Sequence, residues 1–334
     1  MSGAYSSRPQ GSRTADLLGS NAQLLSIAGF FLIMVVIFSI ASPVFLSTGN
    51  ILNLVRQTAP ILIVATAMTF VITTGGIDLS VGSVVALINA SAAILLQAGM
   101  PWPLAVIGLI LLGAAIGAMQ GWFIAYQGIQ AFIVTLAGLS ALRGIALLMT
   151  EGFSIPISTD LGFVSIGRGW FLGVPAPTWL ALIVAVLGFI VFRSTRFGRY
   201  VTAIGANQEA ARRSGIATRR TILWVYVLTG IASAVAGIVI AARLGSGSSN
   251  AAVGFELEVI AAVVLGGTSL MGGRGSIFGT VLGALTIGVI GNGLILAHVS
   301  PFFTQIVTGA IILLAVWLNA QVFSRLTSTT RRTN

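Results

Sequence analysis

Few side chains in this sequence are suited to covalent or metal chemistry. The 334 residues include no Lys and no Cys, and the one His is His298. A P-loop or Schiff-base lysine, a thiolate nucleophile, a disulfide and a metal site built from Cys or from a His cluster are therefore excluded. We expect no catalytic residue, no metal site and no nucleotide hydrolysis in this polypeptide, so we predict that it is not an enzyme.

One polar segment, Thr73 to Ser83 (TTGGIDLSVGS), interrupts a long apolar run. Its adjacent glycines free the backbone from helix, and Asp78 can accept hydrogen bonds from the first amides of a following helix. A carboxylate is costly at the centre of a bilayer, so Asp78 must lie in a cavity or near an interface. Two interpretations stay open: Asp78 only caps a helix, or the segment is a broken helix that contacts a polar solute or shapes a gate.

A second glycine-broken segment, Leu265 to Ser276 (LGGTSLMGGRGS), resembles the first in its Gly pair and its hydroxyl groups. Paired interruptions are typical of transporters built from related halves, although the similarity here is too weak to define a repeat. Glycine-rich loops also bind phosphate, but neither segment has the strand or the lysine of such a loop. A phosphate site is therefore not predicted.

Candidate residues for a solute pathway or gate are the small and polar residues of these segments and the amides of the apolar runs. A neutral solute would meet uncharged polar groups, yet each such group can equally form an interhelical hydrogen bond worth about 0.6 kcal/mol. The candidates are Thr74, Gly75, Gly76, Asp78, Ser80, Asn89, Gly266, Gly267, Thr268 and Asn292.

A third segment, residues 205–216 (GANQEAARRSGI), predicts a short amphipathic helix. Asn207 is a credible N-cap, Glu209 favours the positive start of the helix, and Gly215 can end it. Such a helix can lie against anionic headgroups or dock into a partner protein.

The elements that must position these segments are membrane helices. The chain is 56% hydrophobic and 7% charged, whereas soluble domains carry about 25% charged residues. Since a span needs about 20 apolar residues, we predict an all-α, polytopic helix bundle with about ten transmembrane helices. The expected spans are 24–45, 58–74, three within 79–142, 178–193, 221–243, 255–271 and two within 275–324.

The arginines predict the orientation of this bundle. All 17 basic residues are Arg, against 7 acidic residues, and seven of them fall in residues 193–220. Short Arg-rich loops stay in the cytoplasm, so ten spans place both termini there as well. The basic excess is read as orientation charge in a lipid bilayer, and no nucleic acid is expected to bind.

Glycines recur at steps of four in two apolar runs, at Gly113, Gly117 and Gly121 and again at Gly275, Gly279 and Gly283. Such faces let helix backbones approach closely in a membrane. We expect them to pack inside one bundle rather than between subunits.

Three of these segments are similar to motifs of one known family. ITTGGIDLSVGS at 72–83, GGTSLMGGRGSIFGT at 266–280, and Glu209-Ala210-Ala211 followed by Gly215 resemble segments of the membrane permease subunits of bacterial ABC importers for monosaccharides, of the ribose, xylose and arabinose type. The last of these resembles the EAA loop, which in that family docks on the ATPase. The resemblance covers roughly residues 25 to 320.

This resemblance implies a membrane subunit that moves a monosaccharide or related polyol across the bacterial inner membrane by alternating access. It implies a cytoplasmic tail at 1–23, a transmembrane permease domain at 24–320 with a cytoplasmic coupling loop at 194–220, and a cytoplasmic tail at 321–334. The implied ATPase-coupling residues are Asn207, Glu209, Ala210, Ala211, Arg213 and Gly215.

The resemblance also implies the partners. They are a second permease copy or close homologue, two ABC ATPase domains and a periplasmic sugar-binding protein. ATP and magnesium would bind to the ATPase, and this chain would bind no cofactor. The sugar is not specified by these motifs.

The alternative is an ion-coupled secondary transporter of a small polar solute, which would also combine many spans with glycine-broken helices. Ion coupling generally uses acidic or basic relays inside the membrane. Beyond Asp78 the sequence offers few such groups.

Overall fold

The computed structural model describes residues 11–160 and 162–300, and the six further residues 303, 306, 307, 309, 310 and 313. Most of the tenth expected span and the whole C-terminal tail at 321–334 lie outside the described residues. So do residues 1–10 of the expected N-terminal tail.

The described part is almost entirely helical, which confirms the all-α prediction. Its two small sheets pair β1 (Ile155–Pro156) with β4 (Ser246–Gly247) and β2 (Trp170–Phe171) with β3 (Val174–Pro175), both antiparallel. The α-helices are α1 Gly11–Ala41, α2 Thr48–Thr73, α3 Val81–Gln97, α4 Trp102–Ala125, α5 Ala131–Thr150, α6 Ser165–Arg168, α7 Ala176–Ser194, α8 Arg196–Ala206, α9 Gln208–Arg213, α10 Thr218–Leu244, α11 Phe255–Leu265 and α12 Ile277–Leu296.

Seven helices of the described residues are long and apolar enough to cross a membrane, namely α1, α2, α4, α5, α7, α10 and α12. The span expected at 255–271 differs, because α11 has only 11 residues. At about 1.5 Å per residue α11 is about 16 Å long, roughly half of the ~30 Å hydrocarbon layer. The physical reason is the glycine pair after Leu265: Gly267 has a φ of +87°, which ends the helix early.

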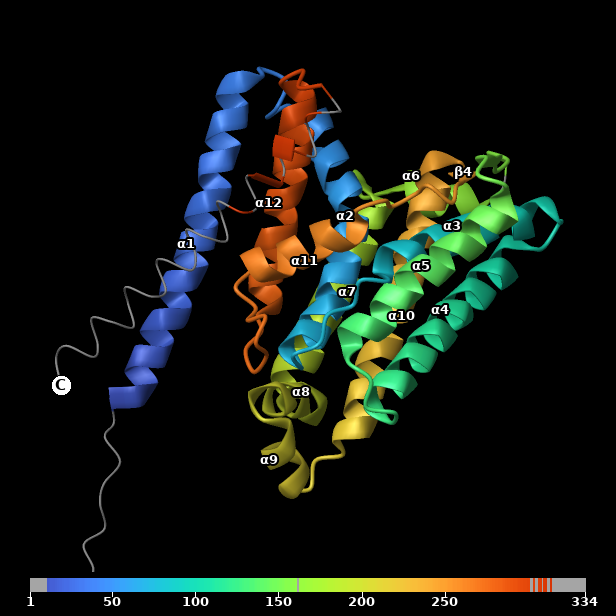
Figure 1. Ribbon diagram of the computed structural model, residues 1–334. Coiled ribbons are helices and arrows are strands. Elements are labelled where there is room, and N and C mark those ends of the chain that lie inside the picture. Colours follow the sequence, from blue (N-terminus) through green and yellow to red (C-terminus); the bar gives the residue numbers. More distant parts are fainter. Residues whose placement is uncertain are drawn as a thin grey trace, which may run out of the picture.

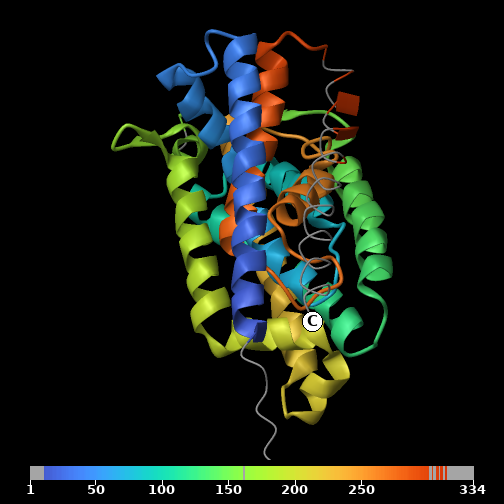
Figure 2. The ribbon, with the colours of Figure 1, turned by 90° about the vertical axis from the view of Figure 1, so that its left-hand side faces the viewer.

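Helices α10 and α2 form the core of the bundle. In their apolar windows 83% and 72% of the residues are buried, against 11% in α1 and 17% in both α5 and α7. Helix α10 packs on α4, α3 and α2, while α12 packs on α2, α11 and α1. Figure 1 accordingly shows α1 and α12 on one side and α4 and α5 on the other, and Figure 2 shows α1 lying along α12.

The outer helices expose large apolar side chains to their surroundings. Leu32 and Ile40 of α1, Leu111 of α4 and Leu148 of α5 are each more than half exposed. Soluble monomers rarely show contiguous apolar surface on this scale, so these faces fit the acyl chains of a bilayer. The chain is a multi-pass membrane protein.

The two ends of the bundle differ in character. Figure 1 shows α8 and α9 at the end where α1 begins, while α6 and β4 lie toward the opposite end. The arginine-rich loop and the start of the first span thus share one end, as the expected threading requires. The assignment of that end to the cytoplasm stays a prediction.

The glycine face of α4 packs against α10. A methyl group at Gly113 would overlap the carbonyl of Gly230, and one at Gly117 would overlap that of Tyr226. A methyl group at Gly121 would lie 3.0 Å from the backbone of Leu223, one turn further along α10. The prediction that these glycines pack inside one bundle is confirmed.

The second glycine face packs α12 against α11 in the same manner. A methyl group at Gly279 would overlap the carbonyl of Gly266, and one at Gly283 would overlap that of Ala262. The short helix α11 is therefore held directly against the backbone of α12.

We predict that Gly117→Val destabilises the bundle, because the new side chain must separate α4 from α10. Overpacking of this kind costs about 1–3 kcal/mol. Gly108→Val is the matched control in the same helix, since nothing lies within 4 Å of a methyl group there. The measurement is the loss of monodisperse protein on heating in detergent. Equal melting of the two variants would contradict the close α4–α10 contact.

Candidate functional site

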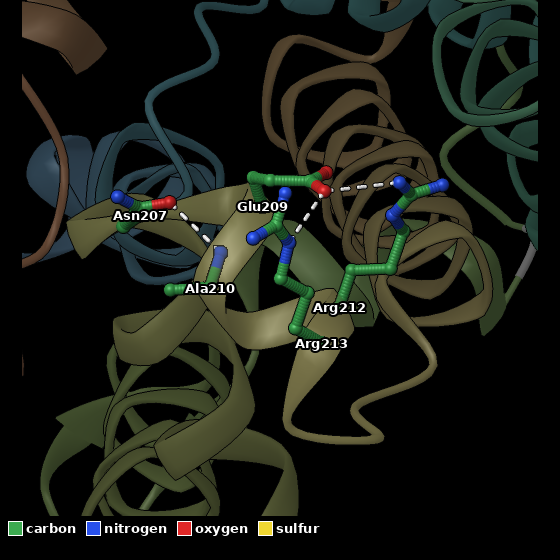
Figure 3. Close-up of polar contacts among 5 residues, drawn as sticks. All are labelled: Asn207, Glu209, Ala210, Arg212 and Arg213. Atoms are coloured by element: carbon green, nitrogen blue, oxygen red, sulfur yellow. Dashed lines mark hydrogen bonds and ion pairs between the residues drawn. The ribbon is translucent and has the colours of Figure 1, made fainter.

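The predicted helix at 205–216 forms as α9, and its start is built as the sequence suggests. Asn207 is extended, with φ −165°, and its Oδ1 accepts a hydrogen bond of 2.9 Å from the amide of Ala210. Glu209 Oε1 accepts bonds from Arg212 Nη2 at 3.0 Å and from Arg213 Nε at 3.1 Å (Figure 3). The hydrogen bond from Arg212, and to a smaller extent the one from Arg213, holds the pKa of Glu209 below its ordinary value.

The end of α9 is a glycine stop. Gly215 has a φ of +81°, and its amide donates to the carbonyl of Arg212 at 3.0 Å. The amide of Ile216 reaches back to the carbonyl of Ala211 at 3.1 Å, which closes the helix end. Ala211 is buried whereas Glu209 and its arginines are exposed, so α9 is anchored on one side and presents charge on the other.

Helix α8 connects α9 to both glycine-broken segments. The carbonyl of Thr73, at the end of α2, accepts a bond of 2.9 Å from the amide of Gly273. A methyl group at Gly205 would overlap both of these backbone groups, and one at Gly272 would meet Gly205 and Gly75 at 3.0 Å. We call this contact of Thr73, Gly205, Gly272 and Gly273 the glycine junction. It brings together three segments that the sequence analysis singled out separately.

Asp78 lies inside a closed polar network. Its Oδ1 accepts from the amide of Ser80 at 2.9 Å and from the hydroxyl of Ser80 at 2.7 Å. The same hydroxyl accepts from Gln120 Nε2 of α4 at 2.9 Å. Asp78 thus bonds the residue before α3 rather than the first amides of the helix, and it ties the broken segment to α4. This network also engages the carboxylate on which an ion-coupled mechanism would depend.

The remaining candidates of the first segment have local or packing contacts. Thr74 Oγ1 donates to the carbonyl of Val71 at 2.7 Å, and Gly75 has a φ of +85° in the turn after α2. A methyl group at Gly76 would lie 2.6 Å from the hydroxyl of Tyr226. These residues shape the turn: the positive φ favours glycine at position 75, and close packing leaves no room for a side chain at Gly76.

Candidates elsewhere also serve to hold elements together. Asn89 Oδ1 accepts from the amide of Ser248 at 2.7 Å, which fixes β4 to α3. Thr268 Oγ1 accepts from the amide of Ser276 at 3.3 Å, which closes the second segment before α12. Gly266 packs on Gly279, as described above.

Two adjoining cavities lie near the ends of α2, α10 and α12 that are remote from α8. Their volumes are about 380 and 190 Å³, and both are lined by Gln57, Ile61, Arg243 and Glu258. We call them the paired cavities. Of the ten pathway candidates only Asn292 lines them.

The pathway residues predicted from the sequence do not include Gln57, Arg243 or Glu258. Two of them are ionisable groups in or beside apolar helices, which is a recognised sign of a solute pathway. These ionisable groups are visible in the sequence, but the sequence alone does not show that α2, α10 and α11 bring the three side chains to the same cavities.

Helices α2 and α12 connect the glycine junction to the paired cavities. Helix α2 ends at the junction with Thr73 and reaches the cavities at Gln57, and α12 begins after the junction and reaches them at Asn292. The hydroxyls of Thr69 and Thr280 join the two helices with a bond of 2.7 Å. The exposed charge of α9 and the cavities are thus linked by two packed helices.

Comparisons with known proteins identify the family to which this architecture belongs. A family model described as the permease component of branched-chain amino acid transport systems matches residues 50–316. The ribose import permease protein RbsC of Haemophilus influenzae is 42% identical over 290 residues, covering 85% of this chain and 89% of that protein. The chain belongs to the sugar permease family of bacterial ABC importers.

Other relatives agree with this assignment. RbsC of Bacillus subtilis is 45% identical over 86% of the permease and 89% of its own length. The xylose transport system permease protein XylH of Escherichia coli is 38% identical over 88% of the permease and 90% of its own length. Permeases of ABC importers work with ATPase and solute-binding partners, so the permease is a membrane subunit of such an assembly.

We predict that Asp78→Ala lowers the free energy of unfolding of the permease by about 1–3 kcal/mol, because the buried amide of Ser80 loses its acceptor. Asp78→Asn is the matched control, since an amide oxygen can accept the same two bonds. The measurement is thermal unfolding in detergent. If Asp78→Ala unfolds at the same temperature as Asp78→Asn, the network is not needed for stability.

Proposed function

We propose that this permease moves a monosaccharide or a related polyol across the bacterial inner membrane by alternating access. ATP hydrolysis by a separate ATPase subunit, which binds ATP and magnesium, drives the transport. The permease itself binds no cofactor and hydrolyses no nucleotide. The exposed face of α9, with Asn207, Glu209 and Arg213, is the surface on which the ATPase rests. Gly215 and the buried Ala211 keep this face in place.

The observation that carries the proposal is the glycine junction. Its contacts are between backbone atoms of Thr73, Gly205 and Gly273, with no side chain that can rearrange between them. A displacement of α8 must therefore displace the end of α2 or the segment before α12. These two helices line the paired cavities, so a force applied at α9 reaches the cavity walls.

The assembly that we propose contains two permease copies, or one copy and a close homologue, with two ATPase domains and a periplasmic sugar-binding protein. The proposal is supported by the relatives, which include a ribose import permease and a xylose transport system permease. A path formed between two copies would open to one side of the membrane at a time as the ATPase domains close and separate. Such a path must bind its solute weakly, because a tight site would slow release.

We predict that Gly215→Val uncouples the assembly. Gly215 has a φ of +81°, which a β-branched residue adopts only with strain, so α9 loses its end and its orientation. Gly215→Asn is the matched control, because Asn tolerates the left-handed conformation. The measurement pairs co-purification of the ATPase with uptake of a labelled sugar, and we expect at least a tenfold loss of uptake for Val alone.

We also predict that Glu209→Ala weakens ATPase docking without preventing membrane insertion, because Glu209 is exposed and, among the described residues, its side chain bonds only to Arg212 and Arg213. The control is Ser154→Ala, an exposed position near the opposite end of the bundle. ATPase co-purification and uptake at wild-type level in Glu209→Ala would contradict the coupling role of α9.

A further inference from the structure

We propose that the paired cavities are a transient binding site for one neutral sugar, held between the side chains of Arg243, Glu258 and Gln57. The inference rests on the proposed function and assigns residues to the solute that passes through the permease.

The size of the site suits a small solute. The larger cavity, at about 380 Å³, falls in the usual range of about 300–1,000 Å³ for small-molecule sites. The smaller cavity adjoins it along the same four residues. One wall is apolar, with Ile61, Ile240 and Phe255, and can contact the non-polar face of a sugar ring.

Arg243 offers hydrogen-bond donors that no described residue uses. Its Nη1 is completely buried and has no hydrogen-bond partner in the described part of the chain. The nearby guanidinium of Arg56 repels its charge. A guanidinium has five donors and no acceptor, so it needs oxygen atoms from a ligand or from water.

Glu258 offers the complementary acceptors. Its side chain is half-buried and forms no hydrogen bond or ion pair with any described residue, although it lines the same cavities as Arg243. A carboxylate has acceptors and no donor when ionised. The cavities therefore hold a donor and an acceptor of opposite charge that do not pair with each other.

A neutral polyol satisfies both groups at once. Each sugar hydroxyl can donate to Glu258 and accept from Arg243, and the amide of Gln57 can do either. An anionic solute would be attracted by Arg243 but repelled by Glu258, and the reverse holds for a cationic solute. The pair of charges therefore gives no net advantage to either ion, while hydroxyl groups bond to both side chains. A zwitterion also complements both charges, and leucine tests that alternative.

Two other polar side chains of the walls are already engaged, whereas that of Asn250, which lines the larger cavity, forms no hydrogen bond with a described residue. Asn292 exchanges two hydrogen bonds with Asn50, of 2.9 and 3.0 Å. Thr58 Oγ1 donates to the carbonyl of Leu54 at 2.9 Å. The side chains left for a solute are therefore those of Arg243, Glu258, Gln57 and Asn250, and the first three line both cavities.

The loop that closes the larger cavity is fixed in advance. Arg143 of α5 donates to the carbonyls of Ser249 at 2.7 Å, Ala251 at 2.8 Å and Ala252 at 3.3 Å. Ala251 and Ala252 form part of the cavity wall. The site is therefore formed before a solute arrives, and little ordering of the loop is needed on binding.

Site-directed labelling tests the proposal, because the permease has no native cysteine. The assembled importer carrying Gln57→Cys is placed in proteoliposomes and treated with a membrane-impermeant maleimide. The probe sugar is whichever of D-ribose, D-xylose and other labelled sugars the wild-type importer takes up fastest. We expect that this sugar slows labelling of Gln57→Cys at least threefold.

Two controls make the result specific. Ser154→Cys, exposed near the same end of the bundle, should label at the same rate with and without sugar. Leucine, a zwitterion of similar size, should not protect Gln57→Cys. Protection by leucine equal to that by the sugar, or no protection by a sugar that is taken up, overturns the site while leaving the proposed function intact.

The charged residues are tested in the same background. Glu258→Gln and Arg243→Gln, each combined with Gln57→Cys, should label at the parental rate without sugar and lose the protection by sugar. They should also reduce uptake at least tenfold with the ATPase still bound. A merely structural role would change the labelling rate itself. Wild-type importer that takes up none of the sugars refutes the proposed function and this site together.

Discussion

The structure depends on backbone contact at positions where no side chain intervenes. Lipid supplies no hydrophobic drive for helix association, so membrane helices are held by close packing and by interhelical hydrogen bonds. In this permease the contact is closest at the glycine junction, where Gly205 of α8 meets Thr73 and Gly273. The faces of α4 with α10 and of α11 with α12 follow the same rule. Side chains at these positions would force the helices apart.

The positions of the charged side chains also follow from the lipid surroundings of the helices. Ionised groups are costly inside a bilayer, and those of the described residues lie at the ends of the bundle or in walls of cavities and networks. At the end with α8 and α9 they are exposed, and Glu209 pairs with Arg212 and Arg213. In the paired cavities the side chains of Arg243 and Glu258 form no hydrogen bond or ion pair with a described residue. One end is suited to a protein surface and the other to a small solute.

The local features of the permease could be predicted from its sequence, and the long-range ones could not. The membrane class follows from composition, and the N-cap Asn207 and the stop Gly215 follow from residue types a few positions apart. The glycine faces follow from a spacing of four. In contrast, the hydrogen bond between Asn89 and Ser248 could not be predicted, because only tertiary packing brings these residues together. The same holds for the shared cavities of Gln57, Arg243 and Glu258. The length of α11 was misjudged since apolarity continues past the glycine pair that ends it.

The short helix α11 connects the walls of the paired cavities to the glycine junction along the chain. Phe255 and Glu258 at its beginning belong to the cavity walls, and only a few residues beyond its end the chain enters the glycine junction. In the proposed assembly this helix would couple the ATPase on α9 to a solute in the paired cavities. Because coupling between two sites is reciprocal, each would change the binding of the other by the same free energy. A helix too short to cross the membrane would thereby transmit solute occupancy to the ATPase.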